Sequence, residues 1–281
     1  MRVVDLFSGL GGWARIARER GHDVTTLDLD PRFGADVVED VASWDPPAEL
    51  VRSTALLVAS PPCEAFSNLG ARRNWNPDGS PRSSAAFAGL DAVAATLDLV
   101  ARIEPRWWVL ENPRAQLRRV VAERWPEVSA TRRTVTYCAY GEPMQKPTDL
   151  WGAFPPSLGL APPCRKGDPC HAPSPRGLVD APRDSALGRR NRRGNLTMAK
   201  AQARALFGTS DGPLLAALRA AIPRALAETV LDAAERDLAT ELVGTPGGAG
   251  SRSESGPEDR REQLVARDLG LRDPNPPETA P

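Results

Sequence analysis

Residues 2–12 read RVVDLFSGLGG, an apolar run that breaks into a glycine-rich turn. The short, continuous run over 2–7 is typical of a buried strand. The glycines that follow let the backbone approach a ligand closely and place amide groups at the start of a helix expected over 13–19. A strand, a glycine turn and a helix in this order are typical of a nucleotide-binding α/β domain. By itself the turn fits a dinucleotide as well as any other nucleoside cofactor.

Strands and helices alternate along the first half of the chain. Apolar runs predict further strands over 23–27, 37–40, 56–59 and 107–110. Apolar residues three and four apart, from Phe87 to Val100, predict an amphipathic helix over 84–102. This order of elements predicts a mostly parallel, doubly wound sheet.

Acidic residues stand at the carboxyl ends of these strands, where ligands bind in such sheets. Asp5 lies in the first strand, and Asp28 follows the second strand, where a carboxylate suits a ribose diol. Asp40 ends the third segment, where it suits the exocyclic amine of an adenine. The glycine turn and two acids in this order predict a nucleoside cofactor, and they leave NAD and S-adenosylmethionine both open.

Residues 60–67 read SPPCEAFS, directly after the apolar run that ends at Ala59. Each proline fixes its own φ, and Pro62 also biases Pro61 towards extended backbone. Cys63 therefore leaves the sheet edge on a stiffened chain, as a nucleophile requires. A buried structural cysteine is the competing interpretation of such a thiol.

Three motifs together carry a family resemblance. The stretches DLFSGLGG (5–12), PPCEAFS (61–67) and ENP (111–113) resemble those of the DNA cytosine-5 methyltransferases, over residues 2–151 closely and 213–240 loosely. In the family the asparagine of this motif is followed by valine, whereas in this chain Asn112 is followed by Pro113. The resemblance implies an α/β, Rossmann-like S-adenosylmethionine-dependent methyltransferase fold with a small irregular target-recognition region.

The resemblance also implies roles for single residues. Cys63 would attack C6 of a cytosine as a thiolate, and Glu111 would contact N3 and the exocyclic amine. The base would have to be flipped out of double-stranded DNA to be reached. The residues that would contact S-adenosylmethionine are Phe7, Gly9, Leu10, Gly11, Gly12, Asp28, Leu29, Asp40 and Pro62. Residues 68–83 are similar to the family loop that closes over DNA, and an ordinary surface loop is the alternative.

One motif departs from the family. Where the family has Gln-x-Arg-x-Arg, residues 145–149 read QKPTD, so neither arginine is present. Lys146, Arg114 or a distant arginine could take over the arginines' task of holding the flipped base and its phosphate. The departure is similar to a compact subgroup often found in phage.

The composition divides the chain further. We expect a catalytic and cofactor-binding domain over 1–150, a small basic target-recognition region over 151–212, a helix over 213–242 that returns to the first domain, and a disordered tail over 243–281. Between residues 164 and 193 there are eight Lys and Arg against three Asp, which fits a surface that meets phosphates. A solvated arginine-rich loop is the alternative.

A possible structural zinc site arises from the remaining cysteines. Cys138, Cys164, Cys170 and His171 form a complete ligand set for zinc. Their spacing does not follow the common Cys-x-x-Cys pattern, so zinc stays a hypothesis and its ligands are unknown.

The overall composition sets wider limits. The net charge of the 281 residues is zero, so bulk charge indicates no partner. We expect no membrane span, because no run of about 18 apolar residues occurs. The start has no signal-peptide pattern, and four cysteines fit a reducing, cytoplasmic setting. We expect a monomer acting on double-stranded DNA, with a restriction endonuclease partner left open. Alternatives are an RNA cytosine methyltransferase, transfer of a modified methyl group, and a catalytically weak DNA-binding regulator.

Overall fold

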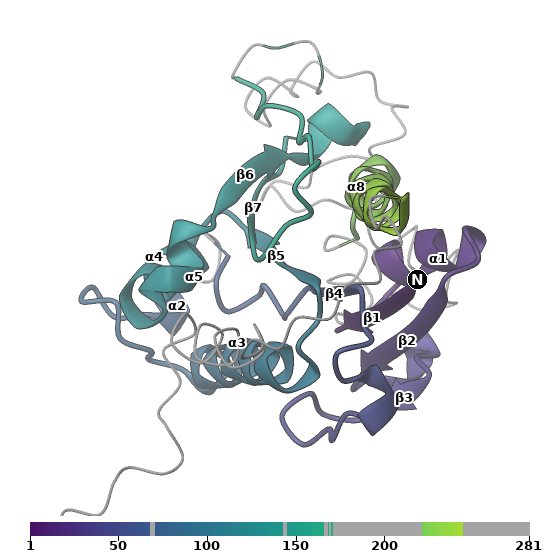
Figure 1. Cartoon of the computed structure of the whole chain (residues 1–281). Helices are drawn as coiled ribbons and strands as arrows, with labels where there is room; N and C mark the ends of the chain where they lie inside the picture. Colours follow the sequence, from purple (N-terminus) through teal and green to yellow (C-terminus); the bar gives the residue numbers. More distant parts are fainter. Residues whose placement is uncertain (68–70, 143–144, 166–167, 169, 171–220, 244–281) are drawn as a thin grey trace, which may run out of the picture.

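The computed structural model describes residues 1–67, 71–142, 145–165, 168, 170 and 221–243. Its centre is a seven-stranded sheet in the order β3-β2-β1-β4-β5-β7-β6 (Figure 1). The strands are β1 (Arg2–Leu6), β2 (Asp23–Asp28), β3 (Val37–Val38), β4 (Leu56–Ala59), β5 (Trp107–Pro113), β6 (Arg133–Thr136) and β7 (Pro147–Trp151). Strands β1 to β5 pair in parallel, and β7 runs antiparallel to both of its neighbours. The expected doubly wound, mostly parallel sheet is confirmed, while β6 and β7 were not predicted.

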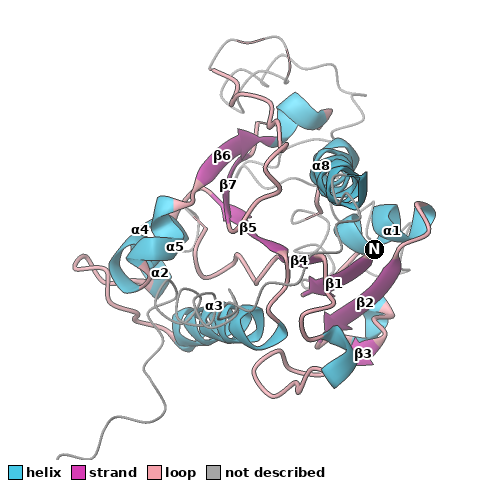
Figure 2. Ribbon diagram, in the orientation of Figure 1, coloured by secondary structure: helices cyan, strands magenta, loops and turns pink. Residues whose placement is uncertain are grey.

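Helices cover both faces of the sheet (Figure 2). They are α1 (Gly12–Glu19), α2 (Ala71–Asn74), α3 (Ser84–Ile103), α4 (Gln116–Arg124), α5 (Pro126–Ala130) and α8 (Arg224–Val243). Successive strand residues point to opposite faces. Val4 and Leu57 therefore join a core under α3 and α4, whereas Val3 and Leu56 join a second core under α1 and α8. Both faces are buried, which explains why the strands are continuous apolar runs.

Helix α3 is the most apolar helix of the described residues. It is the one helix there that is long and apolar enough to cross a membrane by length and composition. Its face from Leu90 to Ile103 is buried in the first core, as in the core helix of a folded domain. Phe87, which the spacing puts on that face, is instead 53% exposed. Ala86, one residue earlier, is the residue of this first turn that is buried in the core.

Helix α8 lies against α1, although some 200 residues separate them in the sequence. It begins directly after Pro223, whose carbonyl accepts the amide of Leu226 (3.1 Å). The contact is close at Gly12, where a Cβ would lie 2.8 Å from Ile222 Cβ. Arg20 donates to Asp232 at 2.5 Å. Residues 221–243 therefore pack on the first domain, and residues 213–220 lie outside the described part.

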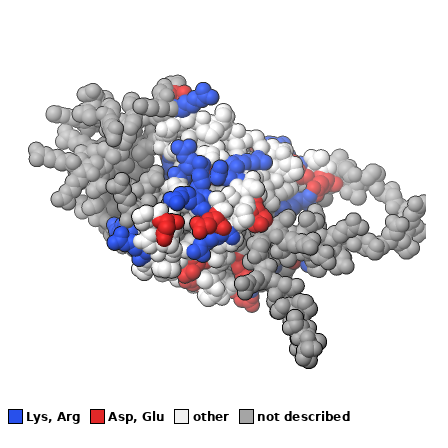
Figure 3. Space-filling view, turned by 90° about the vertical axis from the view of Figure 1, so that its left-hand side faces the viewer, with Lys and Arg blue, Asp and Glu red and all other residues white. Residues whose placement is uncertain are grey.

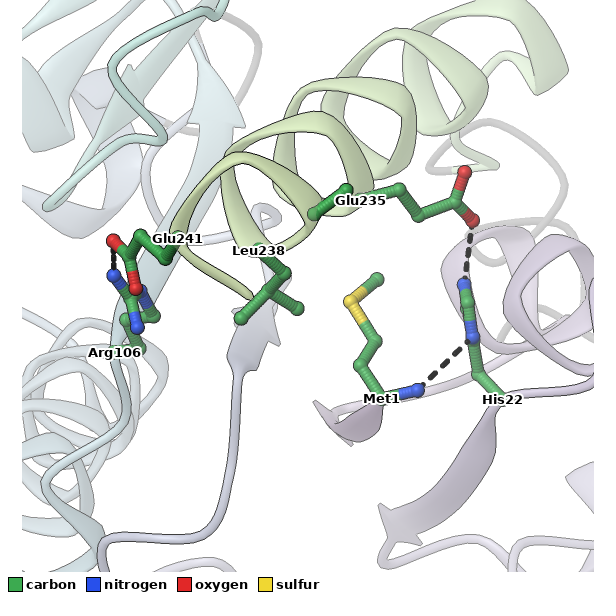
Figure 4. A pocket seen from close by; sticks show the side chains of 7 residues that line it. Met1, His22, Arg106, Glu235, Leu238 and Glu241 are labelled. Atoms are coloured by element: carbon green, nitrogen blue, oxygen red, sulfur yellow. Dashed lines mark hydrogen bonds and ion pairs between the residues drawn. The ribbon is translucent and has the colours of Figure 1, made fainter. Parts of the chain in front are cut away.

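The amino ends of the strands form a hollow of about 610 Å³ beneath α8 (Figure 4). His22 joins the amino group of Met1 (3.4 Å, at Nδ1) to Glu235 (2.7 Å, at Nε2). Arg106 and Glu241 form an ion pair on the other side of the hollow. These pairs tie the helix to the sheet at the edge opposite the expected ligand site.

The first domain extends past residue 150. Strand β7 includes Trp151, whose side chain is fully buried. The carbonyl of Ala153 accepts the amide of Trp108 (2.9 Å), and Leu158 is buried in the second core. The expected boundary between 150 and 151 therefore falls within packed structure. Residues 171–212 and 244–281, most of the expected recognition region and nearly all of the expected tail, lie outside the described residues.

Candidate active site

The glycine turn joins β1 to α1 through left-handed backbone. Gly9 (φ 49°) and Gly11 (φ 70°) adopt this conformation at little cost, because they have no Cβ. Phe7 adopts it too (φ 58°), which is rare for a bulky side chain. A strained residue at the end of the first strand is typical of a functional site.

Asp28 holds the glycine turn in place. Its Oδ2 accepts the amide of Gly9 at 2.8 Å, and its Oδ1 accepts the amide of Asp30 at 2.9 Å. Each carboxylate oxygen can accept a second hydrogen bond. Asp28 can therefore bind a diol while it still fixes the turn.

Two apolar side chains stand exposed beside this carboxylate. Leu29 is 66% exposed, and Val38, which pairs in register with Asp28, is 51% exposed. Asp40, two residues further on, is exposed and accepts the amide of Ala42 (2.9 Å). Exposed apolar surface between two carboxylates fits a flat, hydrogen-bonding ring such as adenine. The sequence did not predict a role for Val38. Its exposure, in a strand of only two residues, is seen in the structure alone.

The other side of the glycine turn borders an open hollow of about 630 Å³. Its walls are residues of the turn together with side chains of α1 and the segment after β2, among them Gly9, Leu10, Gly11, Arg15, Arg18 and Phe33. Asp28 and Asp40 do not line it. The structure therefore brings Gly9, Leu10 and Gly11 to a cavity and Asp28, Leu29 and Asp40 to the adjoining strand ends.

Cys63 begins a tight turn after β4. Its carbonyl accepts the amides of Phe66 (3.1 Å) and Ser67 (2.9 Å), and Phe66 is fully buried. Cys63 as a residue is partly exposed, and Pro62 is exposed. The structure thus presents the thiol at the sheet edge on an anchored turn, which disfavours the interpretation as a buried structural cysteine.

The cysteine turn is fastened to the next strand. Asn112, fully buried on β5, donates from Nδ2 to the carbonyl of Pro61 at 3.0 Å. Because Asn112 directly follows Glu111, this bond fixes the acid relative to the cysteine turn. Sequence reasoning placed Cys63 and Glu111 at neighbouring strand ends but did not identify this bond.

Glu111 is 3% exposed and has two partners in the described structure. The hydroxyl of Tyr137 donates to Oε1 at 2.7 Å, and Lys146 Nζ lies 4.0 Å from the same oxygen. Lys146 also lies over the ring of Tyr137, 4.2 Å from its centroid. The tyrosine and the lysine enter the site from the segments beside β6 and β7, and no pattern in the sequence indicated a role for Tyr137.

Burial and charge act in opposite directions on the two central groups. Burial raises the pKa of the Cys63 thiol, the Lys146 ammonium lowers it, and the Glu111 carboxylate raises it. Burial also raises the pKa of Glu111, which Lys146 and the Tyr137 hydroxyl lower. Lys146 is therefore the cation that favours the thiolate form of Cys63. Two neighbouring groups whose pKa values are both raised by burial and lowered by the same cation are typical of catalytic sites.

The missing arginines are replaced by structural residues. Pro147 begins β7, and Asp149 is fully buried. Asp149 accepts two hydrogen bonds from Arg118, at 2.8 and 2.5 Å. Neither position can present a cation, because one is a strand proline and the other a buried acid. Lys146, one residue before them, is the cation that the structure does bring to Glu111.

The segment after the cysteine turn is partly packed. The indole of Trp75 donates to the carbonyl of Ala65 at 2.8 Å, and Ser83 donates to Asn74 at 2.9 Å. Trp75 and Asn74 are both buried. The expected DNA-closing loop is therefore anchored near its middle to the cysteine turn, through Trp75 and Ala65, whereas residues 68–70 lie outside the described residues.

The side that carries α4 and α5 is rich in arginine (Figure 3). From 114 to 133 the sequence has six arginines and two glutamates. Exposed members include Arg114, Arg119 and Arg124. Figure 3 shows the basic side chains gathered with acidic ones among them, a surface that can meet phosphates without being uniformly positive.

The chain is similar to several known methyltransferases. No protein-family model matches the chain. Over 158 residues the chain is 30% identical to a probable DNA (cytosine-5)-methyltransferase of Frog virus 3 (isolate Goorha), covering 54% of this chain and 70% of that protein. It is 27% identical over 136 residues to the type II methyltransferase M.HgiGI of Herpetosiphon aurantiacus, covering 43% of this chain and 97% of that protein. Among solved structures, the methyltransferase EhMeth of Entamoeba histolytica aligns over 85% of this chain and 98% of that one, with 12% identity and a TM-score of 0.48.

The viral relative is matched over more than two thirds of its length. The similarity agrees with the motifs at residues 5–12, 61–67 and 111–113, and the expected methyltransferase fold and enzyme class are confirmed. The chain belongs to the family of DNA (cytosine-5)-methyltransferases.

Proposed function

We propose that this enzyme transfers a methyl group from S-adenosylmethionine to C5 of cytosine in double-stranded DNA through a covalent adduct on Cys63. The observation that carries the proposal is the bond from Asn112 Nδ2 to the Pro61 carbonyl (3.0 Å), which locks the cysteine turn to the strand of Glu111. A nucleophile and an acid fixed in this way can act on two atoms of one ring.

Cys63 acts first. Its thiolate forms a bond to C6 of the cytosine, and the electron pair of the C5–C6 double bond moves into the ring, which makes C5 nucleophilic. Glu111 faces N3 and the exocyclic amine and stabilises the charge that develops there. Its raised pKa favours the protonated acid, which can donate to N3. After C5 gains a methyl group, a base such as water removes its proton. The electron pair of the C5–H bond re-forms the C5–C6 double bond as the C6–sulfur bond breaks, which releases the Cys63 thiolate and 5-methylcytosine.

S-adenosylmethionine, when bound, supplies the electrophilic methyl group that C5 takes up. Asp28 suits its ribose diol, Asp40 its adenine amine, and Leu29 with Val38 the faces of its ring. Gly9, Leu10, Gly11 and Gly12 would bring backbone close to the amino-acid part, flanked by Phe7 and Pro62. The orientation of Asp28 by two amides supports this assignment.

Lys146 takes the place of the absent arginines in this proposal. Its ammonium, 4.0 Å from Glu111, can contact the flipped base or its phosphate while it lowers the pKa of Cys63. A lysine is a point charge without the planar fork of arginine, so it would fix the base less rigidly. Flipping the base costs a few kcal/mol, which contacts of this kind must offset.

The proposal extends to the compartment, the oligomeric state and the partners of the enzyme. We propose a cytoplasmic monomer whose residues beyond 164 read the DNA sequence. The type II name of the bacterial relative favours a restriction–modification setting with a partner endonuclease. The arginine-rich side beside α4 supports contact with a phosphate backbone.

The decisive experiment separates the substrate classes. The full chain is incubated with S-adenosylmethionine carrying a labelled methyl group and with either double-stranded DNA or RNA, and the nucleosides are analysed by mass. We expect labelled 5-methylcytosine from DNA only. Label in RNA cytosine would favour the RNA alternative, and cofactor binding without any transfer would favour a DNA-binding regulator.

A second experiment tests the covalent step. DNA with 5-fluorocytosine at the target position has no C5 proton to lose, so the adduct on the enzyme should persist. We expect a protein–DNA band that survives denaturation, with the linkage mapped to Cys63 by peptide mass. A transfer-competent enzyme that gives no such band would disprove the covalent mechanism.

A further inference from the structure

We propose that Cys138, Cys164 and Cys170 form a binding site for one zinc ion, which fastens the chain after residue 164 to the catalytic domain. The three Sγ atoms lie within 4.8 Å of one another. No other group of three or more Cys, His, Asp or Glu side chains in the described part of the chain is close enough to hold a metal.

The distances between the sulfur atoms suit a tetrahedral metal. Zinc–sulfur bonds of about 2.3 Å place thiolates about 3.8 Å apart in a tetrahedral site. The Cys170 and Cys138 sulfurs are 3.7 Å apart, and those of Cys138 and Cys164 are 3.0 Å apart. The Cys138–Cys164 pair has to open by less than 1 Å to accept the ion, and all three sulfurs already lie within 4.8 Å of one another. The Cys170 side of the trio is exposed, so water or another ligand can take the fourth position.

The local backbone is arranged to bring the three thiols together. Cys138 lies in the buried turn Tyr137–Tyr140 that follows β6. The amide of Cys164 donates to Thr136 Oγ1 at 2.9 Å, which fixes the second ligand to the same turn. The amide of Arg165, next to Cys164, donates at 2.5 Å to Asp168, which is two residues before Cys170 in the sequence.

A neighbouring side chain supports thiolate ligands. Gln145 Nε2 lies 3.2 Å from Cys164 Sγ and donates to it. Hydrogen bonds to ligand atoms from the surroundings are a regular feature of protein metal sites. A disulfide explains the cluster less well, since it would use two of three gathered thiols, and the expected reducing compartment disfavours it.

The site would also steady the active site. Tyr137, which precedes Cys138, donates its hydroxyl to Glu111, and its amide donates to the carbonyl of Lys146. Gln145, which precedes Lys146, contacts Cys164. Loss of zinc should therefore loosen both the tyrosine and the lysine that face Glu111, although neither is a metal ligand.

The test is metal analysis of the full chain, purified in a non-chelating reductant with zinc in the growth medium. We expect about one zinc per chain, as in other structural sites. Cys164→Ser and Cys170→Ser should each bind less than about a tenth of that amount, because two thiolates hold zinc poorly. Cys63→Ser, the fourth cysteine of the chain, is the matched control and should keep its zinc.

Cobalt provides a second readout that does not depend on activity. The cobalt-loaded protein should show the intense visible bands of tetrahedral cobalt and a thiolate charge-transfer band, and both should be lost in Cys170→Ser. This variant changes an exposed side chain, so it separates lost binding from lost folding. Less than about a tenth of an equivalent of zinc in the reduced wild-type chain would overturn the proposal. A Cys138–Cys164 disulfide in the metal-free protein, with no uptake of cobalt after reduction, would overturn it too.

Discussion

The carboxyl edge of the sheet has two ends that are built in different ways. At the end formed by β4, β5 and β7, Glu111 is 3% exposed and Tyr137 2% exposed, and side chains bond to one another. At the end formed by β1, β2 and β3, Leu29 is 66% exposed, and Asp28 bonds only to backbone amides in the described structure. One end is buried and made of side chains, and the other is open and made of backbone.

The difference follows from what each end has to do. Bond-making needs groups with shifted pKa values, and burial with nearby charges is the means of shifting them. Holding a nucleoside needs shape and hydrogen bonds, which glycine backbone and a preset carboxylate supply by their geometry. Substitutions at the first end should therefore change the reaction rate, and those at the second end should change cofactor affinity.

Cys63→Ser should have the largest effect. Without the thiolate the rate of methyl transfer should fall by about 10⁴-fold or more, as for other removed nucleophiles. Cofactor affinity should change by less than about 2-fold, because Asp28 and the glycine turn are untouched. Transfer is measured with labelled cofactor, and affinity by calorimetry. A fully active Cys63→Ser enzyme would show that Cys63 is not the nucleophile.

Glu111→Gln should follow, with a fall in kcat of about 10²- to 10³-fold, because the amide cannot protonate N3 and stabilises the ring charge less well. The matched control is Glu64→Gln, since Glu64 is also an acid near Cys63 but is exposed. The control should stay within about 3-fold of wild type. Equal losses in both variants would show that negative charge near the thiol matters and the buried acid does not.

Strands β1, β4 and β5 could be predicted because each contains a short apolar run buried on both faces. Strand β7 could not, since its sequence Pro147-Thr148-Asp149 is polar and begins with proline. Asp149 is buried only because Arg118, on α4, donates two hydrogen bonds to it. A partner 31 residues away is not visible in local periodicity.

For the candidate site, the sequence predicted the two central residues but not the contacts that hold them. Cys63 and Glu111 follow from the family motifs, and the strand order places them at neighbouring ends. The bond from Asn112 to Pro61 and the position of Tyr137 depend on the register of β5 and on the turn after β6. Those contacts are set by tertiary packing, so a sequence motif carries no information about them.

Lys146→Met should lower kcat/KM by about 10- to 100-fold at pH 7. The ammonium lowers the pKa of Cys63, so its removal raises that pKa and leaves less thiolate at neutral pH. The acidic limb of the pH–rate profile should therefore move to higher pH, and the loss should shrink as the pH rises. Lys146→Arg keeps the charge and should keep the wild-type limb. A Met variant with an unshifted profile would show that Lys146 acts only by binding substrate.

Asp28→Asn tests the open end of the edge. It should raise the Kd for S-adenosylmethionine by about 10-fold, the usual value of one charged hydrogen bond, and leave kcat at saturating cofactor within about 3-fold. Asp30→Asn is the control, since Asp30 is paired to Arg32 and should bind cofactor normally. A large fall in kcat for Asp28→Asn would mean that the two ends are coupled and that the comparison is too simple.

Asp5 should produce the smallest effect on activity and a clear one on stability. This acid lies under the glycine turn, where burial raises its pKa to about 7. Its Oδ2 accepts the amide of Ala14 at 3.1 Å, and its Oδ1 has no hydrogen-bond partner among the described residues. The open end thus contains one buried acid of its own, and the comparison predicts that this acid stabilises the turn without taking part in the reaction.

The pH dependence follows from the sign of that shift. The folded pKa is about 7 and the usual value is 3.8, so the folded chain holds a proton that the unfolded chain has lost between those values. The stability contributed by Asp5 is complete below about pH 3.8 and falls as the pH rises to about 7, by up to about 4 kcal/mol. Asp5→Asn keeps an acceptor for Ala14 but cannot ionise. Urea unfolding should show the variant gaining on wild type between pH 5 and pH 8, with kcat within about 3-fold. A constant difference between the two across this range would place the carboxyl in contact with water, and the buried acid would then be a feature of the catalytic end alone.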